Sequence, residues 1–288
     1  MNNFYLSQIY AFITVFLWST SYVFTKLALQ HFSAGALGFF RCLVASLCLL
    51  LVLLLKKQPL PRASLLPGLV ASGAAGFAVY FVLFNTGSSL LNATTACVVI
   101  STSPIITALL ALGIYRERIS PAGWFSILLA FGGILVMMLH KGGLSLTGGL
   151  PWMLGAAFLI SVYNILQRGL SRHCGALQSI AYSYFSGTAL LFWCLPGALE
   201  ELARASWTHI ALACYLGVFP GAVAYGVWTR ALAVAPKTSG VTNYMLLTPF
   251  LALLLEYGLT DVVPGMETFL GGGMILLGLL CYAVSGRR

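Results

Sequence analysis

The chain has 288 residues, of which 60% are hydrophobic and 7% charged, with a formal net charge of +9. Soluble globular domains carry about 25% charged residues, so this composition excludes an ordinary soluble enzyme and requires a lipid bilayer as solvent. The seven cysteines are scattered, without the Cys and His spacing of a metal site, and we expect neither a metal nor a cofactor.

Apolar runs of about 20 residues, long enough to cross the hydrocarbon core, follow one another along the chain. They fall at 8–29, 34–55, 66–87, 92–113, 121–139, 150–168, 176–198, 208–231, 238–259 and 266–285. We therefore predict an all-α membrane protein with ten transmembrane helices and short loops. The first run is long enough to remain as a span, so we expect no cleaved signal peptide.

Basic residues are unevenly shared between the predicted loops. With the N-terminus inside, eleven basic residues fall on the cytoplasmic side, from Lys56 to Arg288, and only Lys141 and Arg204 fall outside. Cytoplasmic loops are enriched in Lys and Arg. We predict that the N- and C-termini are both cytoplasmic, and that the positive charge reflects topology and not nucleic-acid binding.

The two halves of the chain match each other at a shift of 145 residues. The shift places Gly76 on Gly221, Tyr80 on Tyr225, Pro104 on Pro249 and Gly133 on Gly278. Since each half holds five predicted spans, an odd number, the halves must lie in opposite orientations. We predict two inverted five-helix repeats, 1-145 and 146-288, an architecture that suits alternating access.

Pro104 and Pro249 lie at corresponding positions inside apolar runs, and Pro104 follows three hydroxyl residues. A proline frees a backbone carbonyl one turn earlier, so we predict that the helices bend near Pro104 and Pro249. A row of small residues on one face of 121–139 predicts a helix-packing seam. This row consists of Gly123, Ser126, Ala130 and Gly133.

The segments LWSTSYVFTK and SPIITALLALGIYRERISPAGWFSILLAFGGILV resemble the EamA-type branch of the drug/metabolite transporter (DMT) superfamily. The resemblance covers the whole chain, as two five-helix repeats. It implies an exporter or exchanger of small metabolites, with a central cavity lined mainly by the first, third, fourth, sixth, eighth and ninth helices. The second half departs from the motif, since Val262 occupies the place that corresponds to Glu117.

Polar side chains at membrane depth require partners or a wet cavity. The predicted substrate-binding residues come from six helices and are Trp18, Ser21, Tyr22, Tyr80, Phe84, Ser101, Thr102, Tyr163, Asn164, Tyr225, Trp228, Asn243 and Tyr244. Their aromatic and hydrogen-bonding character suits an amphiphilic or zwitterionic metabolite, such as an amino acid with an apolar side chain. For Ser101 and Thr102, bonds to their own backbone are the alternative.

Three charged residues, Lys26, Arg41 and Glu256, lie inside predicted spans at a similar depth near the outer side. We hypothesise that Glu256 pairs with Lys26 or Arg41 and so closes or stabilises one state. Snorkelling to the interface is the alternative for Lys26. Together with Pro104 and Pro249, these residues form the predicted gating or coupling set.

We therefore predict a secondary active transporter that exports or exchanges such a metabolite across a bacterial-type inner (plasma) membrane. Broad-specificity drug efflux is the alternative, followed by a channel or a membrane-embedded enzyme. No catalytic constellation is evident, because all four histidines map to loops or span edges. Either Glu256 carries a coupling proton, or the protein is an exchanger or uniporter. We expect a monomer, with a dimer as the alternative.

Overall fold

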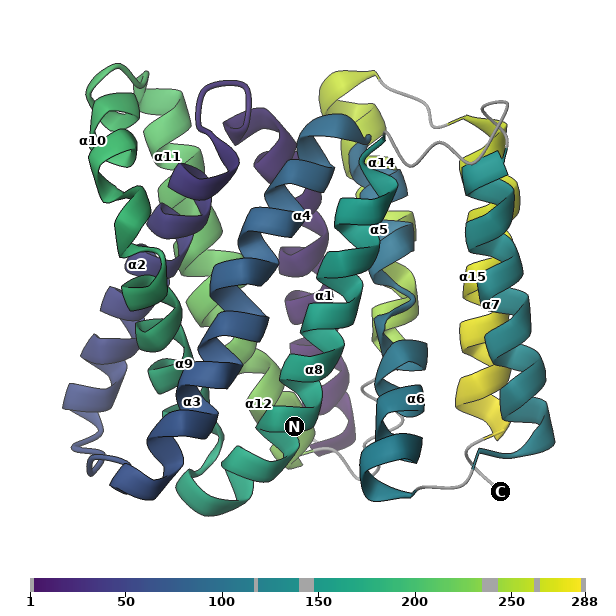
Figure 1. Cartoon of the computed structure of the whole chain (residues 1–288), viewed down its shortest axis with the longest axis horizontal. Coiled ribbons are helices and arrows are strands. Elements are labelled where there is room, and N and C mark those ends of the chain that lie inside the picture. Colours follow the sequence, from purple (N-terminus) through teal and green to yellow (C-terminus); the bar gives the residue numbers. More distant parts are fainter. Residues whose placement is uncertain (1–2, 117–118, 140–147, 235–242, 262–264, 286–288) are drawn as a thin grey trace.

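The computed structural model describes residues 3–116, 119–139, 148–234, 243–261 and 265–285. All regular structure within these ranges is helical (Figure 1), which confirms the all-α prediction. Helical residues occupy each of the ten predicted runs. Among the residues described, six helical segments are long and apolar enough to cross a membrane, judged by length and composition: Tyr5–Ala28, Ala34–Leu55, Ala63–Leu90, Ala93–Ile114, Leu150–Leu170 and Trp207–Trp228.

The first half of the chain forms two long helices followed by a series of joined helical pieces. These are α1 (Asn3–Ala28), α2 (Ala34–Leu55), η1 (Ala63–Leu65), α3 (Leu66–Gly73), η2 (Ala74–Ala78), α4 (Val79–Leu90), α5 (Ala93–Ile100), α6 (Ser103–Tyr115) and α7 (Pro121–Leu139). The side chains of Ser33 and Asn92 accept backbone N–H groups and so cap the start of α2 and α5.

The second half is built in a similar way. Its elements are α8 (Leu150–Cys174), α9 (Ala176–Leu190), η3 (Phe192–Cys194), α10 (Leu195–Ala203), α11 (Trp207–Leu216), η4 (Gly217–Val223), α12 (Ala224–Val234), η5 (Asn243–Leu247), α14 (Thr248–Thr260) and α15 (Met266–Ser285). The predicted run 176–198 overran its helix, because α9 ends at Leu190 and α10 begins at Leu195. Pro196 lies in the first turn of α10, where its missing N–H costs nothing.

Both halves interrupt a helix immediately before a proline, as predicted. Residues 101–102 separate α5 from α6, and Pro104 lies in the first turn of α6. The 3₁₀ segment η5 leads into α14, and Pro249 lies in the first turn of α14. Each of these helices then ends on a left-handed residue, Arg116 with φ 54° and Asp261 with φ 53°.

A second local feature recurs at the same spacing. The segments η2 and η4 are π-helical, so each carries an extra residue in its turn. Gly76 lies in η2, and its sequence counterpart Gly221 lies in η4. The backbone irregularities of the first half therefore return in the second half at the positions that the sequence match indicates.

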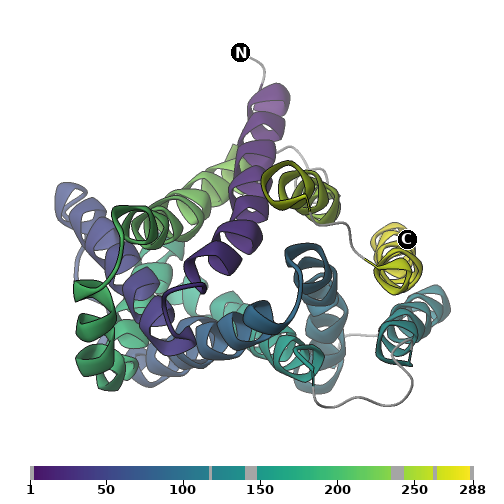
Figure 2. The same ribbon diagram turned by 90° about the horizontal axis from the view of Figure 1, so that it is seen from above.

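Helices α7 and α15 form a pair at one edge of the bundle (Figures 1 and 2). A Cβ at Gly133 would lie 2.4 Å from the carbonyl oxygen of Gly271, and one at Gly278 would lie 2.7 Å from that of Ser126. Partner numbers fall as residue numbers rise, so the helices are antiparallel. The two contacts exchange under the 145-residue shift, which is the pattern that a two-fold axis produces. The predicted small-residue seam forms this contact.

A similar exchange links α2 and α9 to the π-helical regions. A Cβ at Gly73 would lie 2.5 Å from the carbonyl oxygen of Ser183, and one at Gly217 would lie 3.1 Å from that of Arg41. Each glycine therefore lets a helix of one half approach the backbone of the other half. By this contact, Arg41 and Ser183 occupy corresponding positions.

Candidate functional site

An aromatic cluster lies where α1, α4, α8, α9 and α12 approach one another. It consists of Trp18, Tyr22, Phe77, Tyr80, Phe81, Phe84, Tyr163, Tyr184, Tyr225 and Trp228. The ring centroid of Trp18 lies 5.7 Å from that of Tyr225 and 5.3 Å from that of Trp228. These distances are typical of favourable aromatic pairs, so residues from both halves form one contact network.

The structure brings seven predicted site residues into this cluster and adds three. The predicted ones are Trp18, Tyr22, Tyr80, Phe84, Tyr163, Tyr225 and Trp228. The additions are Phe77, Phe81 and Tyr184. Phe77, Phe81 and Phe84 follow the i, i+4, i+7 spacing of one helical face, which is a signal that the sequence offered.

Burial differs across the cluster. Tyr163 and Tyr184 are fully enclosed, and Gly76 makes room for Tyr163, since a Cβ there would lie 2.2 Å from the Tyr163 ring. Trp18, Tyr80 and Tyr225 are only half-buried. The cluster therefore has a closed side that holds the helices together and a side with accessible ring surface.

Arg41 of α2 places a guanidinium beside these rings. Its side chain is 5% exposed. Nη1 donates to Thr25 Oγ1 at 2.9 Å, and Nη2 donates to Ser21 Oγ at 3.0 Å. The guanidinium carbon lies 4.3 Å from the centre of the Phe81 ring, a distance at which a cation is attracted to an aromatic face.

The Arg41 charge has no acidic partner in the described part of the chain. Its hydrogen bonds go to neutral hydroxyls, and its Nε–H has no hydrogen-bond partner among the described residues. The hypothesised pair with Glu256 is not formed, because the Glu256 carboxylate bonds to other groups. A buried charge without a counter-ion is costly, so the position of Arg41 calls for a reason beyond packing.

Glu256 of α14 binds the start of α5, which belongs to the other half of the chain. Its side chain is 2% exposed. Oε1 accepts the N–H of Ala93 at 2.6 Å, and Oε2 accepts the N–H of Thr94 at 2.8 Å and the Thr94 hydroxyl at 2.7 Å. A helix N-terminus has unpaired N–H groups and a positive dipole end, and both favour a carboxylate.

Lys26 of α1 contacts the same turn from another direction. Its Nζ donates to the carbonyl oxygen of Leu91, the residue that caps the end of α4. Lys26 and Glu256 do not form a close ion pair, although the two opposite charges attract each other at longer range. The two residues thus hold the α4–α5 turn jointly, which we call the α4–α5 clamp.

The hydroxyls of Ser101 and Thr102 bond to their own helix. Ser101 Oγ donates to the carbonyl oxygen of Cys97 at 2.9 Å, and Thr102 Oγ1 donates to that of Val99 at 2.7 Å. In this structure they therefore satisfy carbonyls at the interruption before Pro104, which is the alternative considered above. They make no contact with the aromatic cluster in these bonds.

The remaining predicted residues, Asn164, Asn243 and Tyr244, lie on α8 and η5. Asn164 is exposed, and its Nδ2 donates to Thr107 Oγ1 at 3.5 Å. Asn243 is the first residue of η5. Tyr244 is half-buried and packs in a small apolar group with Trp228, Ala11 and Ala231. Tyr244 is thereby connected to the cluster through Trp228.

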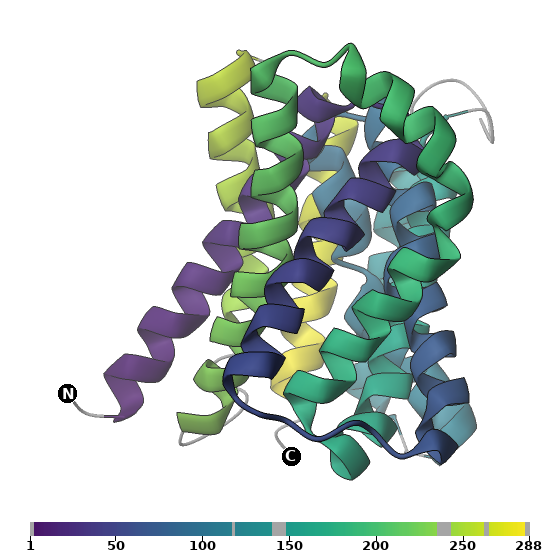
Figure 3. The same ribbon diagram turned by 90° about the vertical axis from the view of Figure 1, so that its left-hand side faces the viewer.

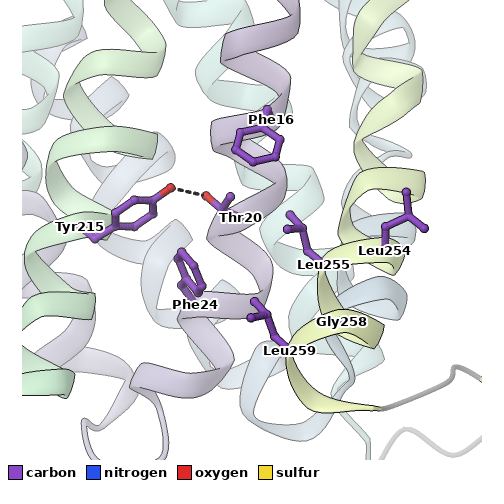
Figure 4. A pocket seen from close by; sticks show the side chains of 8 residues that line it. All are labelled: Phe16, Thr20, Phe24, Tyr215, Leu254, Leu255, Gly258 and Leu259. Carbon is purple, nitrogen blue, oxygen red and sulfur yellow. Dashed lines mark hydrogen bonds between the residues drawn. The ribbon is translucent and has the colours of Figure 1, made fainter.

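A separate pocket of ≈ 490 Å³ lies between α1, α11 and α14 (Figure 4). It is lined by Phe16, Thr20, Phe24, Tyr215, Leu254, Leu255, Gly258 and Leu259. Its two hydroxyls, from Thr20 and Tyr215, bond to each other at 2.9 Å. The pocket therefore offers a ligand almost entirely apolar contact.

Within the described residues, all regular structure is helical, six apolar segments are long enough to cross a membrane, and a buried charge lies beside aromatic rings. These features fit a multi-pass membrane transport protein. The chain belongs to the EamA-like transporter family, whose model matches residues 6–139 and again residues 147–284.

Two similar proteins are also named as transporters. The chain is 28% identical over 270 residues to "Uncharacterized transporter YdfC" of Bacillus subtilis, covering 92% of this chain and 87% of the relative. It is 27% identical over 268 residues to "Probable terminal-alkyne amino-acid exporter" of Streptantibioticus cattleyicolor, covering 93% and 90%. A solved crystal structure, 18% identical and covered to 98% on both sides, superposes with a TM-score of 0.64 and shares the fold.

Proposed function

We propose that this protein is a secondary active transporter that exports or exchanges a small amphiphilic or zwitterionic metabolite by alternating access. An amino acid or a related compound is the substrate class. The family and the named exporter among the relatives support this proposal. The observation that carries it is the aromatic cluster, because half-buried rings beside polar groups fit a ligand with an apolar body and a polar head.

Two inverted five-helix repeats, 1-145 and 146-288, form the architecture of the proposed transporter. The recurring π segments, the paired left-handed helix ends and the exchanged contacts of α7 and α15 support it. Ser46 and Thr188, 142 residues apart, hydrogen-bond to each other at 2.9 Å, as corresponding residues near a two-fold axis would. The family model also matches the chain twice.

Ten membrane crossings with cytoplasmic N- and C-termini, in a bacterial-type inner membrane, complete the proposed topology. The distribution of basic residues supports it. In addition, α1 begins and α15 ends toward the same end of the bundle (Figures 1 and 3). In intact cells, a membrane-impermeant maleimide should label Arg204→Cys and leave Arg62→Cys unlabelled. The reverse pattern would overturn the topology.

The α4–α5 clamp is the proposed outer gate. In this topology the turn between α4 and α5 faces outward, and Glu256 joins the second half to it. While the bonds of Glu256 and Lys26 last, the outer ends of α1, α5 and α14 stay together. Pro104 and Pro249 lie at the interruptions that would let α6 and α14 reorient during opening.

Counterflow in liposomes tests the proposed transport activity. Purified protein, reconstituted and preloaded with an unlabelled amino acid, should take up the same labelled amino acid faster than empty vesicles do. The uptake should saturate. Flux that neither saturates nor responds to preloading would point to a channel. Net uptake into empty vesicles that an imposed pH gradient drives would favour transport in which Glu256 carries a coupling proton, whereas uptake that no pH gradient affects would favour exchange or uniport.

Broad-specificity drug efflux is the second candidate function. The pocket between α1, α11 and α14 favours it, because its lining offers mainly apolar contact. Ethidium and similar apolar cations would then compete with amino acids in the counterflow assay. A lack of competition by such cations would leave metabolite transport as the better account.

A further inference from the structure

We propose that Arg41 binds the carboxylate of the transported metabolite, an inference that rests on the transport function proposed above. The guanidinium fork can donate two parallel hydrogen bonds to a carboxylate, a geometry that lysine cannot supply. The half-buried rings of Tyr80 and Tyr225, which lie close to Arg41, would contact the apolar part of the same ligand. The substrate class is thereby narrowed to amphiphiles that carry a carboxylate.

The first support is that unsatisfied buried polar atoms gather on α2, the helix of Arg41, and on the adjacent α4. Buried polar atoms nearly always have a partner. Within the described ranges, three buried side-chain atoms lack one: Arg41 Nε, Asn85 Oδ1 and Ser88 Oγ. All three lie on α2 or α4, which pack against each other. These two helices therefore carry hydrogen-bonding atoms that a ligand could bind.

The second support comes from the corresponding position in the other half. Arg41 bonds to Thr25 with a separation of 16 residues, and Ser183 bonds to Gln167 at 3.0 Å with the same separation. The same kind of interhelical bond is thus made in the second half by a neutral hydroxyl. Since the Ser183 hydroxyl is sufficient to link the two helices of the second half, packing alone does not require a guanidinium at position 41.

The third support is the chemistry around the charge. The two hydrogen-bond partners of Arg41 are neutral, and Tyr80 and Tyr225 also lie close to it. Neutral hydroxyls can give way to a carboxylate, which is the stronger acceptor. An incoming ligand would then supply the counter-ion that the described residues do not provide.

Matched ligand pairs test the proposal on the wild-type protein. The pairs are L-leucine with L-leucinamide and L-phenylalanine with L-phenylalaninamide, measured as thermal stabilisation in detergent and as competition for counterflow. Liposomes of phosphatidylcholine alone exclude anionic lipid as the bound group. We expect the acids to bind at least about 30-fold more tightly than the amides, the usual scale for a buried charged contact.

Variants at Arg41 separate binding from packing. Arg41→Gln should lower the affinity for the acids to the level of the amides, whereas Arg41→Lys should retain part of the preference. The melting temperature of unliganded Arg41→Gln should not fall, because the variant removes an unpaired buried charge. Arg230→Gln, which removes an exposed arginine of α12, is the matched control and should keep the full preference.

Three results would overturn the inference in distinguishable ways. Equal binding of acids and amides by the wild type would remove Arg41 as a carboxylate site and leave the transporter intact. An acid preference that survives in Arg41→Gln would do the same. If neither series stabilised the wild type or drove counterflow, the proposed metabolite function would itself fail. Should Arg41→Gln not fold, the wild-type comparison and Arg41→Lys decide the outcome.

Discussion

The substitution Glu256→Gln tests whether the α4–α5 clamp is a gate. The wild-type carboxylate accepts three hydrogen bonds from Ala93 and Thr94 while 2% exposed. Glutamine has almost the same shape, but one of its two terminal groups is an NH₂ donor. Wherever that group points, it meets an N–H donor, so at least one backbone N–H at the start of α5 loses its partner.

The expected cost follows from these contacts. An unpaired buried donor costs about 1–3 kcal/mol, and loss of a charge at a helix N-terminus adds about 0.3–1 kcal/mol. We therefore expect the clamped state to lose about 1–4 kcal/mol relative to an open state that lacks these bonds. That loss corresponds to a shift of roughly 10- to 1,000-fold in the equilibrium between the two states.

Cys97 provides a built-in reporter for the shift. It lies on α5, one turn after Thr94, and is 0% exposed in the clamped structure. In a background without the other cysteines, a membrane-impermeant methanethiosulfonate added from outside should modify Cys97 much faster in Glu256→Gln than in wild type. Glu201→Gln is the control, because Glu201 Oε2 accepts the Ser33 N–H at 2.8 Å in an exposed setting. There we expect little change. Unchanged labelling, transport and thermal stability in Glu256→Gln would refute the gate.

Two further substitutions probe packing and binding. Gly76→Ala should destabilise the protein by about 1–3 kcal/mol, since its Cβ would lie 2.2 Å from the Tyr163 ring. Gly113→Ala is the control and should leave the melting temperature unchanged or raise it slightly, because a Cβ there would meet nothing within 4 Å. Equal changes in melting temperature for the two variants would contradict the close packing at Gly76. Trp18→Ala should raise the half-saturating substrate concentration in counterflow about tenfold or more, whereas Trp207→Ala, at an 85% exposed position, should not. Identical kinetics for both tryptophan variants would place the substrate elsewhere.

The fold could largely be predicted because lipid leaves the backbone few options. Long apolar runs must satisfy their N–H and C=O groups internally, so each run indicates a helix. The interruptions at Pro104 and Pro249 followed from the same reasoning. The π-helical turns at η2 and η4 could not be predicted, because an extra residue in one turn does not change the pattern of a uniformly apolar run. Pro196 indicated a helix boundary within the run 176–198, but the prediction followed the length of the run and placed a single helix there.

The site was predictable where residue types carry the information. Tyrosine and tryptophan deep in a span indicated the aromatic cluster, but Phe77 and Phe81 resembled lipid-facing side chains in an apolar run. The partner of Glu256 was missed for a physical reason. A charge in a sequence suggests an opposite charge, whereas the groups that bind Glu256 are mainly backbone N–H groups, which every residue carries.

The correspondence between the halves bears on which way the transporter faces at rest. A scaffold with two-fold symmetry gives its two faces the same energy, so any bias must come from side chains that differ between the repeats. Glu256 corresponds by the 145-residue shift to Ala111, and Arg41 corresponds to Ser183. The side of the membrane to which such a carrier opens at rest is then determined by a few polar residues that differ between the repeats, and not by the backbone fold. Evolution could reverse it without changing the fold.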